Sequence, residues 1–407
     1  MGALQFTVTH KDPKSLARAG VLTVPHGVVE TPAFIVVGTR ASVKAVDPRD
    51  LVASGTQIAL ANTYHLMLRP GAEAVGEQGG LHTFMQWNGP MVTDSGGFQA
   101  FSLGFAIEHG VGKMLKMFPA EGTHDRETKK QAAPARPKLA KITPDGILFH
   151  SHLDASKHML TPERSIDIQE KLGADIILVL DECTSPLATY EYTRDSLELS
   201  HRWAERSFAA HTNTDQALAG IVQGGAYKDL REHAAKWNAA MPFDSFAIGG
   251  SLGKSKDDMW RILEWTNVIL PENKPRHLLG IGGVDDVFGA VERGIDLFDC
   301  ISPTRLARMG IVHLRPESGG MRANKWRFHL NGSTKAEKGP IDAACGCSTC
   351  ARFSRAYLHH LLHTGELLGY TLTSIHNLYF TNKLFEEIRA AIKAGTYEAL
   401  KNTWLRG

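Results

Sequence analysis

The sequence predicts an α/β fold built on a parallel sheet, with a (β/α)8 barrel as the favoured arrangement. Short aliphatic runs alternate with amphipathic stretches from residue 19 to about residue 312. Each run is brief and ends in glycine or a polar residue, which is typical of a strand buried on both faces. A doubly wound open sheet would show the same alternation, but no G-x-G-x-x-G motif follows the first strand, and its absence favours the barrel.

Seven aliphatic runs are interpreted as strands of this sheet. They are residues 57–62, 90–94, 174–182, 218–224, 245–250, 276–283 and 295–300. Polar residues and glycines stand at their carboxyl ends, the edge at which a (β/α)8 barrel carries its active site. These residues are Asp94, Asp181, Gln223, Gly250, Gly280 and Asp299.

Three amphipathic stretches between these strands are predicted to be helices. Residues 161–173 begin with Thr161 as N-cap and Pro162 in the first turn, and they end at a glycine. Residues 256–267 and 285–294 show the same helical pattern.

Residues 104–147 interrupt the alternation. This segment is rich in lysine, proline, alanine and threonine and has little periodicity. It is predicted to be an inserted loop or hairpin on the rim of the barrel. Either it is a solvated insertion, or it adds a basic contact for a polyanion.

Three of the five cysteines form a C-x-C-x-x-C motif at Cys345, Cys347 and Cys350. Three thiolates and one imidazole make a closed tetrahedral set, which is the composition of structural zinc. Such a site leaves no position for an activated water, so its expected role is to stabilise a C-terminal subdomain. Spacing alone leaves several candidates for the fourth ligand: His376, His359, His360 and His363.

The bulk composition is that of an ordinary globular protein. Hydrophobic residues make up 43% of the 407 residues, charged residues make up 22%, and the formal net charge is +2. Any nucleic-acid surface must therefore be a local patch. No stretch of 18 apolar residues suggests a membrane span, and the N-terminus has no apolar signal core, so the expected location is the cytoplasm.

Asp299 and Cys300 are adjacent candidates for a nucleophile, and Arg305 and Arg308 follow closely. If the cysteine acts, this is a thiol enzyme, whereas if the aspartate acts, its carboxylate must attack a group that the cationic side chains help to hold. Asp181 and Gln223 together could read the donor–acceptor edge of a purine-like base.

In order along the chain, the motifs NTYHLMLRPG, TDSGGFQAFSLG, DECT, GIVQGG, AIGG, FDCISPTRLARMG and CGCSTC…SIHNL closely resemble those of the tRNA-guanine transglycosylases, in their bacterial queuine form. The resemblance implies an irregular TIM barrel with an inserted zinc-binding subdomain. It places the catalytic barrel at 1–312, the zinc subdomain at 313–380, and a C-terminal helix that packs back on the barrel at 381–407.

The resemblance also implies roles for individual residues. Asp299 matches the nucleophile that attacks C1′ of the ribose, and Asp94 matches the general acid/base. The base-binding positions are Asp94, Ser95, Gly96, Gly97, Phe98, Asp181, Gln223 and Gly250. The tRNA-contacting positions are Gly280, Ile281, Gly282, Gly283, Val284, Asp285, Asp286, Thr304, Arg305, Leu306, Ala307 and Arg308. The ligands of one structural zinc ion per chain are Cys345, Cys347, Cys350 and His376, and Cys300 is left as a packing residue.

The implied activity is exchange of guanine at the wobble position of a tRNA anticodon for queuine or preQ1, in queuosine modification, by a homodimer without a membrane partner. A non-catalytic tRNA-binding partner subunit is the alternative, and the presence of Asp299 argues against it. The loop 249–258 departs from the usual bacterial pattern, because Lys254 stands near the place of an expected acid. The loss of a charge partner for the aminomethyl cation of preQ1 favours queuine.

Overall fold

The computed structural model describes residues 2–101 and 140–406, so most of the expected insertion at 104–147 lies outside the described residues. Eight strands form a closed barrel in the order β10-β11-β12-β13-β14-β4-β5-β6, which confirms the predicted fold class. The barrel strands are β4 (Ala33–Val37), β5 (Ile58–Ala61), β6 (Met91–Thr93), β10 (Ile176–Leu178), β11 (Ala217–Val222), β12 (Ser245–Ile248), β13 (Arg276–Leu278) and β14 (Leu297–Asp299).

Six of these strands lie within the runs predicted from the sequence, β11 begins one residue before its run, and β4 is the one that was missed. It lies between Pro32 and Gly38, its first four residues are buried, and β4 pairs in parallel with both β14 and β5. The strand has the same signal as the others, a short aliphatic run that ends at a glycine. It follows an antiparallel sheet formed by β1 (Gln5–Lys11), β2 (Arg18–Val24) and β3 (Gly27–Thr31), which the sequence analysis also missed.

The three predicted helices are confirmed as α6 (Pro162–Leu172), α9 (Lys256–Asn267) and α10 (Val284–Val291). The Thr161 side chain accepts a hydrogen bond from the amide of Arg164, and Gly173 ends α6 with a φ of 72°. The other described helices that carry an α label are α1 (Pro48–Ala53), α2 (Thr63–Leu68), α3 (Ala72–Glu77), α4 (Gly80–Met85), α7 (Tyr190–Ala210), α8 (Lys228–Ala240), α11 (Ser302–Ala307), α12 (Ser348–Arg352), α13 (Arg355–His363), α14 (Leu367–Lys393) and α15 (Tyr397–Leu405). No described helix is both long enough and apolar enough to cross a membrane.

The chain divides into two compact units. The first comprises residues 1–61, 81–92 and 272–407, and the second comprises 62–80 and 93–271. The second unit contains a three-stranded antiparallel sheet of β7 (Ala140–Thr143), β8 (Gly146–His150) and β9 (Lys157–Leu160). Residues 140–147, at the end of the expected insertion, thus belong to β7, its turn and the start of β8.

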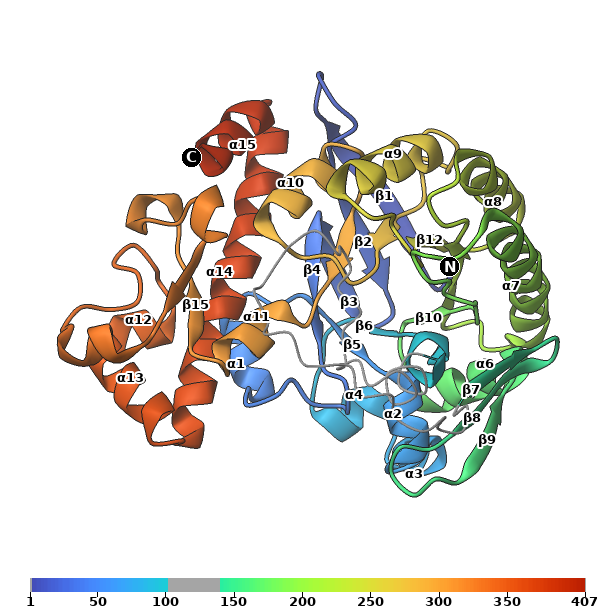
Figure 1. Ribbon diagram of the computed structural model, residues 1–407, viewed down its shortest axis with the longest axis horizontal. Helices are drawn as coiled ribbons and strands as arrows, with labels where there is room; N and C mark the ends of the chain where they lie inside the picture. Colours follow the sequence, from blue (N-terminus) through green and yellow to red (C-terminus); the bar gives the residue numbers. More distant parts are fainter. Residues whose placement is uncertain (1, 102–139, 407) are drawn as a thin grey trace, which may run out of the picture. The chain divides into compact units, whose positions relative to one another are not determined.

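In the first unit, α14 runs beside β15 (Ile311–His313) and α11 (Figure 1). The Asn377 side chain donates to the carbonyls of Pro303 and Ile311 at 2.9 and 3.0 Å and accepts from the amide of His313. One buried amide therefore fixes the helix against both elements. Since α14 is continuous from 367 to 393, the expected boundary at residue 380 lies inside a single helix.

A buried ion pair in the first unit joins β2, near the N-terminus, to the residue just before β14. Arg18 on β2 donates to both carboxylate oxygens of Asp296 at 2.9 and 2.7 Å, and neither side chain is more than 4% exposed. The amide of Arg276 also donates to Asp296 at 2.7 Å. The paired geometry and the additional donor satisfy two charges that are both removed from water.

We predict that Asp296→Ala lowers the free energy of unfolding by about 3–5 kcal/mol, because it leaves the Arg18 guanidinium buried without its counter-charge. Chemical denaturation of the purified variant measures the loss. The exposed pair Lys14–Glu398 provides the control, and Glu398→Ala should leave the unfolding curve unchanged. Equal effects of the two substitutions would contradict the assigned role of the buried pair.

Candidate functional site

Asp94 directly follows β6 and is held by donors from the start of α2. Its carboxylate accepts hydrogen bonds from the Asn62 side chain, the Thr63 amide at 3.0 Å and the Gly96 amide at 3.2 Å. Asn62 is also the N-cap of α2, with its side-chain oxygen accepting from the amide of His65. The cap therefore fixes the amide that orients the Asp94 carboxylate.

The turn after Asp94 packs closely against neighbouring backbone. Gly96 has a φ of 79°, and a Cβ there would lie 3.1 Å from the amide nitrogen of Tyr64. A Cβ on Gly97 would lie 3.0 Å from the carbonyl oxygen of Asp181, so this glycine allows the turn to approach the end of β10. Ser95 is buried, whereas Phe98, which the resemblance assigns to stacking on the base, is 53% exposed.

Asp181, Gln223 and Gly250 follow three consecutive barrel strands, and Gln223 contacts both of the others. The Gln223 amide nitrogen donates to the Asp181 carboxylate, while its Oε1 is buried with no hydrogen-bond partner among the described residues. Gly250 has a φ of 74°, and a Cβ there would lie only 1.9 Å from this Oε1. The residues at 97, 181, 223 and 250 thus form one continuous cluster within the second unit.

This cluster presents acceptors to any ligand that binds there. Burial raises the pKa of Asp181 to about 6, although the hydrogen bond from Gln223 acts in the opposite direction. The Asp181 carboxylate and the unpartnered Gln223 Oε1 are both suited to a ligand edge that is rich in N–H donors. An incoming N–H pair would satisfy groups that the free protein leaves short of partners.

Asp299 is the last residue of β14, in the first unit. Its Oδ1 accepts from His277 Nε2 at 2.9 Å and from the Gly280 amide at 2.9 Å. Among the described residues no donor is bonded to its Oδ2. One carboxylate oxygen is therefore fixed, and the other is left to react.

The stretch 280–286 contacts the end of β14, and the stretch 304–308 lies five residues beyond Asp299 in the sequence, on α11 and just after it. A Cβ on Gly282 would lie 2.7 Å from the Cβ of Cys300, so the first stretch packs directly on the end of β14. In the second stretch Arg305 is exposed, and the half-buried Arg308 donates from Nη1 to the carbonyl of Thr304 at 2.8 Å. Burial and the neighbouring Arg305 lower the pKa of Arg308.

Cys300 differs from Asp299 in its surroundings. Burial raises the pKa of its thiol, and its sulfur accepts a contact from the Ser302 amide at 3.4 Å. A thiol with a raised pKa is protonated at neutral pH and is a poor nucleophile. The local chemistry thus favours the aspartate of this adjacent pair.

The four predicted metal ligands come together in the first unit. Cys345, Cys347, Cys350 and His376 each offer one ligand atom, and all four atoms lie within 4.8 Å of one another. The distances from His376 Nδ1 to the three sulfurs are 3.6, 3.6 and 3.3 Å. Ligands on a tetrahedral ion with bonds of about 2.3 Å to sulfur and about 2.0 Å to nitrogen lie roughly 3.6 Å apart, so the group has the spacing to hold one metal ion.

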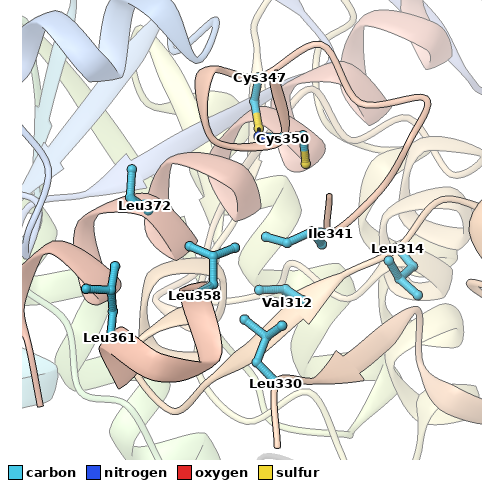
Figure 2. Close-up of a cluster of buried hydrophobic side chains, with 9 residues drawn as sticks. All are labelled: Val312, Leu314, Leu330, Ile341, Cys347, Cys350, Leu358, Leu361 and Leu372. Carbon is cyan, nitrogen blue, oxygen red and sulfur yellow. Dashed lines mark hydrogen bonds between the residues drawn. The ribbon is translucent and has the colours of Figure 1, made fainter. Parts of the chain in front are cut away.

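The surroundings of this group agree with a metal site. His376 Nε2 donates to the carbonyl of His313 at 2.8 Å, which leaves Nδ1 facing the sulfurs. Cys347 and Cys350 also belong to a buried cluster, shown in Figure 2, that includes Val312, Leu314, Leu330, Ile341, Leu358, Leu361 and Leu372. The alternative histidines His359, His360 and His363 lie on α13 and are not part of the ligand group.

Sequence reasoning did not identify the residues that hold the two key carboxylates. His277 contacts Asp299 because β13 and β14 are paired, with His277 opposite Leu297. Asn62 and Thr63 reach Asp94 from the end of β5 and the start of α2. Polar side chains within or just after a predicted strand were the available signal, but neighbouring strands must be known before it can be used.

Comparison with known proteins identifies relatives along almost the entire chain. The sequence model of the family described as "Queuine tRNA-ribosyltransferase" matches residues 12–121 and 126–407. The queuine tRNA-ribosyltransferase of Herpetosiphon aurantiacus is 46% identical over 407 residues, covering 100% of this chain and 93% of the relative. The queuine tRNA-ribosyltransferase of Roseiflexus sp. (strain RS-1) is 44% identical, and the match covers 99% of this chain and 99% of the relative. That of Caldanaerobacter subterraneus subsp. tengcongensis is also 44% identical, and the match covers 100% of this chain and 98% of the relative.

We predict that Asp181→Asn stabilises the free protein, and more so as the pH rises from 5 to 8. The pKa of Asp181 is raised from 3.8 to about 6 on folding, so the folded state binds the proton more tightly. In the unmodified protein, the stabilisation that comes from this tighter proton binding is complete below pH 3.8 and is lost as the pH rises through about 6. An uncharged amide avoids this loss, which reaches about 3 kcal/mol at pH 8. Denaturant unfolding at several pH values measures the difference in unfolding free energy between Asp181→Asn and the unmodified protein. A difference that does not change with pH would contradict the buried charge.

We predict that Cys347→Ser, or prolonged exposure to a strong chelator, releases one equivalent of metal and unfolds the buried cluster around it. Metal affinity contributes folding free energy on the order of 10 kcal/mol at structural sites of this kind. A colorimetric metal assay and thermal unfolding measure the two effects. Cys183→Ser is the control, since Cys183 is in the second unit and should leave the metal in place.

Proposed function

Because the chain belongs to the queuine tRNA-ribosyltransferase family, it is a pentosyltransferase of queuosine modification, and we propose that it exchanges the wobble guanine of a tRNA anticodon for queuine or preQ1 through a covalent Asp299–ribose intermediate. The observation that carries the mechanism is the environment of Asp299. One of its oxygens is bonded to His277 and Gly280, and the other has no donor among the described residues. Such a carboxylate is oriented in advance for attack on a sugar carbon.

In the first step, an Asp299 oxygen forms a bond to C1′ of the ribose while the bond from C1′ to guanine N9 breaks. The electron pair of that bond leaves with guanine, which takes the proton carried by the acid form of Asp94 and leaves Asp94 as a carboxylate. In the second step, Asp94 removes the N9 proton of the incoming base. The electron pair left on N9 then forms the new bond to C1′ and displaces Asp299. Two inversions restore the original anomeric configuration, as in retaining glycosidases, and no nucleoside triphosphate is consumed.

Recognition of the base is proposed for the cluster of Asp181, Gln223 and Gly250, next to the turn 95–98. The Asp181 carboxylate and the Gln223 Oε1 are two acceptors, and guanine and its 7-deaza analogues share an edge with adjacent N–H donors. The target nucleotide must leave the stack of the anticodon loop to present that edge. Exposed Phe98 is proposed to stack on its ring.

The loop after β12 supports queuine as the preferred incoming base. The Asp258 carboxylate accepts from the amides of Lys254 and Ser255 and from Arg261, so it is engaged in capping α9. Lys254 is exposed, and its charge has the same sign as the aminomethyl group of preQ1. The larger, diol-bearing queuine depends less on a carboxylate at this place.

The 280–286 and 304–308 stretches are proposed to contact the tRNA beside the wobble nucleotide, with Arg305 and Arg308 holding phosphates and bases in register. The Cys345–Cys347–Cys350–His376 group is proposed to hold one structural zinc ion. The resemblance also supports a homodimer that works in the cytoplasm, and sedimentation of the purified protein tests the dimer.

We predict that Asp299→Asn abolishes the covalent tRNA adduct and lowers the rate of base exchange by at least about 10³-fold, because an amide oxygen cannot replace the carboxylate as nucleophile. Denaturing gels of the enzyme mixed with tRNA detect the covalent adduct as a protein band of reduced mobility. Cys300→Ala is the matched control and should still form it.

An adduct that survives in Asp299→Asn and disappears in Cys300→Ala would replace the aspartate mechanism by a thiol mechanism. Binding of tRNA without any exchange or adduct in the unmodified protein would indicate a non-catalytic partner subunit. Displacement of labelled guanine with a higher kcat/KM for preQ1 than for queuine would overturn the proposed base preference.

A further inference from the structure

A second group of metal-ligating side chains lies in the second unit, on helices that the proposed reaction does not use. Glu198 and His201 are three residues apart on α7, and His233 is on α8, which lies beside α7 (Figure 1). One ligand atom from each of the three residues lies within 4.8 Å of the other two. The spacing of Glu198 and His201 places both on one face of the helix.

The separation between two members of this group is close to that around a bound ion. His233 Nε2 lies 3.4 Å from Glu198 Oε1. Two nitrogen or oxygen ligands on a tetrahedral ion, with bonds of about 2.0–2.1 Å, lie roughly 3.3 Å apart. The ligand atom of His201 lies within 4.8 Å of both, and Glu198 and His233 are each more than half exposed, so their side chains are free to adjust to an ion.

His201 is the member that an ion pair alone does not explain. Its side chain is 5% exposed, and its Nε2 is buried without a hydrogen-bond partner among the described residues. Its ring is stacked on Trp237 with centroids 4.0 Å apart and planes inclined by 9°, which fixes the plane of the imidazole. Buried polar atoms are nearly always partnered, so a buried imidazole with an orphan nitrogen, in a residue that also offers one ligand atom to this group, points to a missing ligand.

We propose that Glu198, His201 and His233 form a binding site for a divalent transition-metal ion of the zinc class. Two imidazoles and one carboxylate suit zinc or cobalt, whereas calcium and magnesium require sets made mainly of oxygen ligands. Three protein ligands leave a fourth position for water or a small anion. The ion joins α7 to α8, so it stabilises the folded protein in proportion to its concentration over its dissociation constant.

Cobalt(II) is the probe, because it distinguishes this site from the Cys345–Cys347–Cys350–His376 group. Cobalt bound to the cysteines shows a sulfur-to-metal charge-transfer band, and cobalt bound to nitrogen and oxygen shows only ligand-field bands. Metal-depleted full-length protein is titrated with cobalt chloride. We expect the unmodified protein to take up one equivalent with the charge-transfer band and a further equivalent without it.

His233→Gln should remove the equivalent that lacks the charge-transfer band, or weaken its binding by at least about tenfold, while the thiolate-bound equivalent remains. Because His233 is exposed, this variant should fold normally. His201→Gln tests the buried ligand in the same way, and His10→Gln replaces an exposed histidine outside the group and should bind metal as the unmodified protein does. Zinc should also raise the melting temperature of His10→Gln more than that of His233→Gln.

Two results would overturn the proposal. One is a titration in which the unmodified protein binds cobalt only with the charge-transfer band. The other is a His233→Gln variant that keeps the additional equivalent with the affinity of His10→Gln. Neither result bears on the covalent intermediate at Asp299, so this site and the proposed function are tested separately.

Discussion

The chemistry assigned to this chain depends on how its strand-end carboxylates are held before any substrate arrives. A carboxylate that is partly removed from water needs hydrogen-bond donors, and these donors determine how stable its charged form is. Asp94 accepts from Asn62, Thr63 and Gly96, and Asp299 accepts from His277 and Gly280 on a single oxygen. Asp181 has one side-chain donor and a pKa raised to about 6. Asp181 is also the carboxylate proposed to receive the N–H donors of the base. The burial that raises its pKa and destabilises its charged form therefore also leaves it in need of those donors.

The Cys345–Cys347–Cys350–His376 group is linked through α14 to α11, the helix that follows Asp299. This helix carries His376 and Asn377 side by side, and the two residues serve different neighbours. His376 faces the three sulfurs, while Asn377 is bonded to the carbonyls of Pro303 and Ile311. Thr373, one turn earlier, donates to the carbonyl of Ala307 at 3.1 Å. A metal ion held by the C-terminal group would thereby fix the helix against which α11 rests, and α11 carries Arg305.

Much of this arrangement follows from the sequence, and the parts that do not follow share a cause. Aliphatic runs with polar ends located seven of the eight barrel strands and placed Asp94, Asp181, Gln223 and Asp299 at strand ends, because those signals are local. The C-x-C-x-x-C spacing likewise predicted a metal group. The donors His277 and Asn62 escaped notice because their roles depend on which strands are neighbours, and spacing along the chain does not specify pairing. The choice of His376 over the three histidines of α13 required the family resemblance for the same reason.

The adjacent Asp299 and Cys300 show how the fold assigns different roles to neighbouring residues. The segment 280–282 meets both: the Gly280 amide donates to the Asp299 carboxylate, and Gly282 leaves room for the Cβ of Cys300. The same backbone therefore stabilises a charge on one side chain and encloses the other in protein, where burial raises the pKa of the thiol. A carboxylate needs no base to become a nucleophile, whereas this thiol would need one to remove its proton. Since one short segment produces both environments, a glycine-to-alanine change at 282 would disturb the thiol's packing and the carboxylate's donor together.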